Sequence, residues 1–85
     1  MDDSGISYEE AIITELRERI DAAGGLNVFV REHPDLDKRN VGKHITKQLP
    51  TLPALLKYLS YLGVTWEEFF AASARRQEAS KPEDM

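Results

Sequence analysis

The chain contains no cysteine among its 85 residues. Without thiols it has neither a disulfide framework nor a thiolate metal site, so the stability of the folded state must come from packing. No apolar run approaches the roughly 20 residues that a membrane-spanning helix needs, and Met1-Asp2-Asp3-Ser4 is acidic where a signal peptide would be basic. These absences argue against the secreted and membrane classes, and we expect a cytoplasmic protein.

Positive charge is scarce and unevenly distributed. The chain has 11 lysines and arginines against 15 acidic residues, a formal net charge of -4. A negative protein attracts phosphates poorly, but residues 1–26 and 58–85 hold the negative excess, whereas residues 27–57 have six basic against three acidic side chains. This basic middle segment is the part of the chain where a nucleic-acid contact is expected.

The length allows one domain with one core. Apolar residues recur at helical spacing and no pair of strands is indicated, so the sequence predicts an all-α fold. The five expected helices cover residues 8–23, 28–33, 37–49, 52–62 and 66–76. Residue types that cap helix N-termini precede them: Ser7, Asn27, Asp37, Thr51 and Thr65. The polar segments 1–6 and 77–85 are expected to be disordered, which leaves residues 7–76 as the domain.

The same periodicity predicts which side of each helix is buried. In residues 8–23 we expect the charged side chains, Glu15 included, in water. The expected buried stripe of this helix is Ile12, Ile13, Leu16, Ile20 and Ala23. In residues 52–62 the leucines form the expected buried stripe: Leu52, Leu55, Leu56, Leu59 and Leu62.

Residues 37–49 combine an apolar side with a basic one. The side expected to face the core repeats at intervals of four: Val41, Ile45 and Leu49. At about 100° per residue, the opposite side is basic: Arg39, Lys43 and Lys47. Gly42 lies at the border of the buried side and predicts a close crossing by another helix, because glycine otherwise costs a helix about 1 kcal/mol.

A brief second helix joined by a tight turn to a third that is apolar inside and basic outside is typical of a helix-turn-helix domain. The segments Leu16–Ile20, Gly25–Asn27 and Leu52–Phe70 resemble the XRE (Cro/C1-type, lambda-repressor-like) family, over about residues 12–71. The chain departs from the family pattern at residues 33–36 and 47–50. The resemblance implies a five-helix lambda-repressor-like fold that binds double-stranded DNA.

The resemblance also implies roles for individual residues. The exposed start of the third helix would read bases in the major groove through Arg39, Asn40 and Lys43. Phosphate contacts would come from a wider set: Asn27, Arg31, Lys38, His44 and Lys47. Dimers are frequent in the family, and the aromatic residues of the fifth helix are the expected interface: Trp66, Phe69 and Phe70. The alternative for the basic side is an ordinary solvated helix face.

Nothing in the sequence indicates an enzyme, a cofactor or a metal. His33 and His44 lie near Asp35, but no HExxH motif, cysteine or clustered triad accompanies them. The pairs Glu9-Glu10 and Glu67-Glu68 stand in the first turns of helices, where capping and the helix dipole explain them.

The sequence thus predicts a sequence-specific transcriptional regulator, a bacterial or phage repressor of the small Cro-like kind. Its activity would be controlled by homodimerisation or by a second protein. The rival hypothesis is a protein-interaction module of the same fold, antitoxin-like or anti-repressor, that does not bind DNA by itself. An acidic surface on the first helix, from Glu9 to Asp21, would support the rival.

Overall fold

The computed structural model describes residues 7–80. The disorder predicted for residues 1–6 and 81–85 lies outside the described residues. Five helices follow one another: α1 (Tyr8–Ala22), α2 (Leu26–Glu32), α3 (Lys38–His44), α4 (Leu52–Leu62) and α5 (Trp66–Ser80). The described part of the chain has no strand, so the prediction of an all-α, five-helix fold is confirmed. Helix α5 continues through Ser80, and residues 77–80 are therefore helical, not disordered as predicted.

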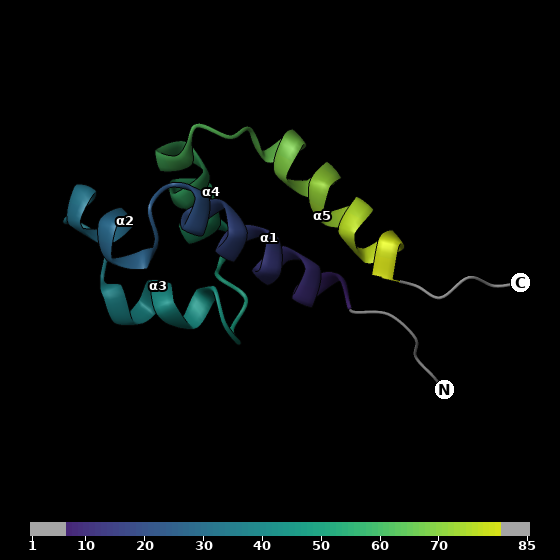
Figure 1. Cartoon of the computed structure of the whole chain (residues 1–85), viewed down its shortest axis with the longest axis horizontal. Coiled ribbons are helices and arrows are strands. Elements are labelled where there is room, and N and C mark those ends of the chain that lie inside the picture. The colour runs from purple at the N-terminus through teal and green to yellow at the C-terminus, as the bar shows by residue number, and fades with distance from the viewer. Residues whose placement is uncertain (1–6, 81–85) are drawn as a thin grey trace, which may run out of the picture.

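Helix α1 runs through the middle of the molecule, and α5 lies along one side of it (Figure 1). Helices α2 and α3 pack against each other, with α3 at the outer edge away from α5. Every helix contributes to a single buried cluster: Ile12, Leu16, Ile20, Phe29, Val41, Leu55, Tyr58, Leu59 and Phe69, joined by Ile45 just after α3. The fold therefore holds α3 against the core by one side and leaves its other side in water.

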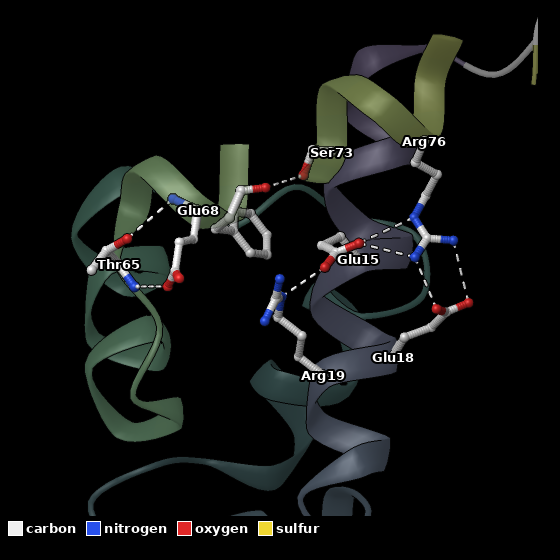
Figure 2. Close-up of polar contacts among 8 residues, drawn as sticks. Glu15, Glu18, Arg19, Thr65, Glu68, Ser73 and Arg76 are labelled. Carbon is white, nitrogen blue, oxygen red and sulfur yellow. Dashed lines mark hydrogen bonds and ion pairs between the residues drawn. The ribbon is translucent and has the colours of Figure 1, made fainter. Parts of the chain in front are cut away.

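Local capping explains where most helices begin. The Ser7 hydroxyl accepts from the Glu10 amide at 3.1 Å, while the Ser7 amide donates to the Glu10 carboxylate at 3.2 Å. Thr65 and Glu68 form the same reciprocal pair at the start of α5 (Figure 2). The predicted caps Asp37 and Thr51 are also confirmed, by acceptance from the amides two and three residues on, respectively.

The predicted cap Asn27 is wrong. Helix α2 begins at Leu26, and its N-cap is Gly25, which has a φ of 99° and makes no side-chain cap hydrogen bond. Only glycine adopts such a φ without steric cost. Asn27 therefore lies inside the first turn, where its side chain is exposed.

Helix α3 is shorter than predicted and ends at His44. The Lys43 carbonyl accepts from the amides of Thr46, Lys47 and Gln48, which turns the chain away from the helix axis. A proline at position 50 also disfavours helical backbone just before it. Leu49 is consequently 38 % exposed instead of facing the core.

Three further burial predictions are corrected. Ala23 was expected in the buried stripe, but it is the C-cap of α1 and is exposed. A Cβ on Gly42 would meet the nearest atom of Leu26 at 3.7 Å, an ordinary contact, so the predicted close crossing at this glycine is absent. In α4 the core side of the helix holds Leu55 and Leu59, whereas Leu52 and Leu56 are exposed. The helix is apolar around more of its circumference than the core can cover.

Glu15 was expected in water, but it is only 7 % exposed. The Arg76 guanidinium on α5 donates to the Glu15 carboxylate at 2.9 and 3.3 Å, and to the Glu18 carboxylate at 2.8 and 3.3 Å (Figure 2). Arg19 donates to the other Glu15 oxygen at 2.7 Å. Hydrogen bonds to Glu15 and Glu18 raise the pKa of Arg76. This ionic cluster of Glu15, Glu18, Arg19 and Arg76 joins α5 to α1.

We expect Arg76→Ala to lower the free energy of unfolding by about 2 kcal/mol, because hydrogen bonds between charged groups contribute about 1.5–3 kcal/mol. The buried Glu15 carboxylate would also lose one of the two cations that offset its desolvation. Urea denaturation followed by circular dichroism measures the effect. Arg75→Ala is the matched control, since Arg75 is exposed and should change stability by less than about 0.5 kcal/mol. Equal losses in the two variants would contradict the role of the cluster.

Candidate nucleic-acid interface

The solvent side of α3 carries the residues predicted to read bases. Arg39, Asn40 and Lys43 are all exposed, whereas Val41 is fully buried. Because Arg39 and Lys43 each lie two residues from Val41, they project roughly opposite to it. Asp37 caps the helix and accepts from the Arg39 amide at 3.2 Å, so the first turn is held in helical geometry. The structure thus brings the three predicted base-reading residues onto one face.

The basic residues of this face have no acidic partner in the described part of the chain. The ion pairs between residues 7 and 80 involve Arg19, Lys57 and Arg76 as the cations. None involves a cation on or next to α3: Lys38, Arg39, Lys43 and Lys47. The positive charge of α3 is therefore available to an anion outside the described chain. We call these four residues the basic face.

The remaining predicted phosphate contacts on α2 are Asn27 and Arg31. Both are exposed, and they lie one turn apart on the same helix side. Helix α2 packs against α3, so Asn27 and Arg31 belong to the same half of the molecule as the basic face.

An aromatic cluster fixes the turn between α2 and α3. The His33 ring stacks on Tyr61 with centroids 3.9 Å apart and planes 6° from parallel. Phe29 meets His33, Tyr58 and Tyr61 edge to face at 5.1–6.4 Å. Such pairs contribute about 0.5–1.5 kcal/mol each beyond the area they bury. The cluster therefore ties the turn, and with it the start of α3, to α4.

Asp35 in the same turn is bound to α4 by its carboxylate. It accepts from the Tyr61 hydroxyl at 2.8 Å and lies 3.4 Å from the Lys57 ammonium. The Tyr61 hydrogen bond has the largest effect on the pKa of Asp35 and lowers it. Desolvation opposes this effect, and smaller contributions from the Asp35 backbone and from Lys57 lower the pKa further. Tyr61 has no role predicted from the sequence, because local patterns do not link positions 26 residues apart. Asp35 thus has its hydrogen-bond partner Tyr61 and its ion-pair partner Lys57 both on α4.

His44 contacts the core through one ring nitrogen. Its Nδ1 lies 2.8 Å from the hydroxyl of the buried Tyr58. Burial, and to a lesser extent the charge of Lys43, lower the pKa of His44 from its ordinary 6.5, so the charged imidazole is disfavoured in the fold. A neutral imidazole can still donate one hydrogen bond, and the phosphate contact of His44 stays a prediction.

The predicted dimer interface needs one correction as well. Phe69 is 0 % exposed and belongs to the core, so it has no surface to offer a second chain. Trp66 is 56 % exposed and meets the partly exposed Phe70 edge to face at 6.4 Å. The exposed Tyr8 donates to the Phe70 carbonyl at 3.4 Å. These three residues, Tyr8, Trp66 and Phe70, form an exposed aromatic patch over α1 and α5.

Comparisons with protein-family models, with curated proteins and with solved structures give no match. The XRE assignment therefore stays a prediction from the three sequence segments. Among the described helices, none is both long and apolar enough to cross a membrane. Within residues 7–80, no group of three histidine, aspartate or glutamate side chains is placed to hold a metal ion.

The lowered pKa of His44 predicts a specific pH dependence of stability. Between the lowered pKa and about 6.5, the unfolded chain binds a proton that the folded chain does not, so the free energy of unfolding falls as the pH decreases through this window. His44→Gln removes this contribution and keeps a polar partner for Tyr58. We expect the stability advantage of the wild type over the variant to be full above about pH 6.5 and to shrink below it. Urea denaturation across this range measures it, and a constant difference would contradict it.

Proposed function

We propose that the protein binds double-stranded DNA by placing α3 in the major groove. The observation that carries the proposal is the basic face, which has no acidic partner in the described part of an otherwise acidic chain. Arg39 has the fork geometry for guanine O6 and N7, and Asn40 has the donor and acceptor for adenine. Lys43, one turn further, reaches another base edge.

Phosphates would be contacted by the remaining predicted residues. Lys38 and Lys47 flank the base-reading side chains, and Asn27 and Arg31 present polar groups from α2. Such contacts set the register of a protein on the duplex without reading sequence. The stacked His33 and the bound Asp35 support the proposal, because they hold the turn before α3 in one position.

We further propose a regulator of transcription, acting as a repressor in the cytoplasm and without catalytic activity. A repressor that covers a palindromic site needs two copies, with half-sites one helical turn of about 34 Å apart. The aromatic patch is the surface that we assign to this homodimer, because a large exposed tryptophan beside a second ring favours contact with another apolar surface.

The rival hypothesis, a protein-interaction module, receives less support from the geometry. It relied on an acidic surface along α1, but Glu15 is buried and both Glu15 and Glu18 are paired with Arg76. The α1 carboxylates that do not pair with Arg76, and so remain for a partner protein, lie at the two ends of that helix. The basic face, by contrast, forms no ion pair with any residue between 7 and 80.

Fluorescence anisotropy with a pool of labelled duplexes, across a salt series, tests the DNA-binding proposal. Arg39→Ala with Lys43→Ala should weaken binding to the selected sequence by about 1–3 kcal/mol per lost base contact, while the circular dichroism spectrum stays unchanged. Arg39→Lys is the matched control: it keeps the charge and loses the bidentate fork. It should retain the salt dependence and lose selection at one base. A wild type that ignores duplex DNA even at low salt would overturn the proposal.

Analytical ultracentrifugation tests the homodimer. We expect Trp66→Ala to shift the protein to the monomer at concentrations where the wild type is dimeric, because aromatic side chains dominate the energy of such interfaces. Leu56→Ala is the control, since it removes an exposed apolar side chain of α4 outside the aromatic patch. Dissociation by Leu56→Ala but not by Trp66→Ala would move the interface to α4.

A further inference from the structure

A pocket of about 470 Å³ lies between α1 and the turn that follows α3. Its walls are Glu10, Ile13, Thr14 and Arg17 from α1, and Thr46 and Lys47 from the turn. The pocket therefore lies at the C-terminal end of α3 and shares Lys47 with the basic face. Its α1 wall extends this end of the face onto a third helix.

Arg17 stands apart from the other arginine of α1. Arg19 is held by the Glu15 carboxylate at 2.7 Å. Arg17 forms no ion pair with any residue between 7 and 80. Instead one of its terminal nitrogens donates to the Ile45 carbonyl at 3.5 Å, a long hydrogen bond that turns the guanidinium toward the end of α3. Most of its five N–H donors are left for another acceptor.

The rest of the pocket divides into groups that favour an anion and one that opposes it. Lys47 supplies a second cation without an ion pair in the described chain, and the Thr14 hydroxyl has no hydrogen-bond partner among residues 7–80. The Thr46 hydroxyl already donates to the Gly42 carbonyl at 2.7 Å, so its proton is not available. Glu10 places a carboxylate in the wall, although that carboxylate also accepts from the Ser7 amide.

We propose that this pocket is a phosphate-binding subsite in which Arg17 and Lys47 together bind one phosphate of the DNA backbone. The inference rests on the proposed function and adds α1 to the interface that α2 and α3 form. Arginine suits the role because its planar fork matches two phosphate oxygens at once. A phosphate held here would lie beyond the C-terminal end of α3, and it would fix how far the helix slides along the groove.

The salt dependence of duplex binding tests the subsite. Arg17→Gln and Lys47→Gln should each reduce the slope of log K against log salt by about 0.9, which corresponds to about eightfold weaker binding near 0.1 M salt. Arg17→Lys should restore most of the slope, because it returns the charge. Arg75→Gln removes a charge of the same type from the exposed side of α5 and should leave the slope unchanged. Unchanged slopes in both Arg17→Gln and Lys47→Gln would overturn the proposal.

A substitution of Glu10 tests the subsite in the opposite direction, because it should strengthen duplex binding where the other variants weaken it. Glu10→Gln removes the opposing charge from the pocket, and it keeps the capping pattern because glutamine also serves at this position. We expect it to strengthen duplex binding severalfold. Glu9→Gln removes the same charge from a neighbour that does not line the pocket, so it should have a smaller effect. Equal effects of the two variants would indicate a general change in net charge and contradict the subsite.

Failure of the subsite can be told apart from failure of the proposed function. If the wild type binds no duplex, inorganic phosphate is titrated into the labelled protein and the amide resonances of Thr14 and Thr46 are followed by NMR. Saturable shifts that Arg17→Gln abolishes would support an anion site for free phosphate. The absence of shifts would overturn it. If the wild type binds duplex and only Arg39 and Lys43 variants weaken it, the proposed function stands without this subsite.

Discussion

Helices α2 and α3 have seven residues each, far fewer than the roughly 12–15 that an isolated helix needs to persist in water. They exist because Phe29 and Val41 are buried in the one core to which all five helices contribute. The proposed interface depends on this constraint, since Arg39, Asn40 and Lys43 share a face only while α3 is helical. Loss of the core would therefore separate these three side chains without changing their charges.

The charged side chains divide into those that pair within the fold and those that face solvent. Acidic side chains are used within the fold: Glu15 and Glu18 bind Arg76, and Asp35 binds Tyr61 and Lys57. Cations that take part in these contacts are not available for a partner. The cations of the basic face, by contrast, have no carboxylate partner within the described residues. A protein of net charge -4 can thus present a positive surface, because the field near a surface depends on the local charges more than on the total.

Much of the fold was predictable because the signals are local. A capping box involves residues three apart, and both Ser7–Glu10 and Thr65–Glu68 are found as expected. The exposure of Arg39, Asn40 and Lys43 also followed from helical periodicity. Where the prediction failed, the cause lies in competing backbone geometry: Gly25 takes the N-cap position in place of Asn27, and the turn after His44 removes Leu49 from the core.

The sequence by itself determined the helices, most of their caps and the segregation of basic residues, since each depends on neighbours within about four positions. Only the tertiary structure decided which charged side chains have a partner within the fold. The contacts of Arg76 with Glu15, of Tyr58 with His44 and of Arg17 with the end of α3 all join separate elements. Periodicity places a residue on a side of its own helix, but it does not say which other helix packs there. The partner of each charge is set by how the helices pack around the shared core.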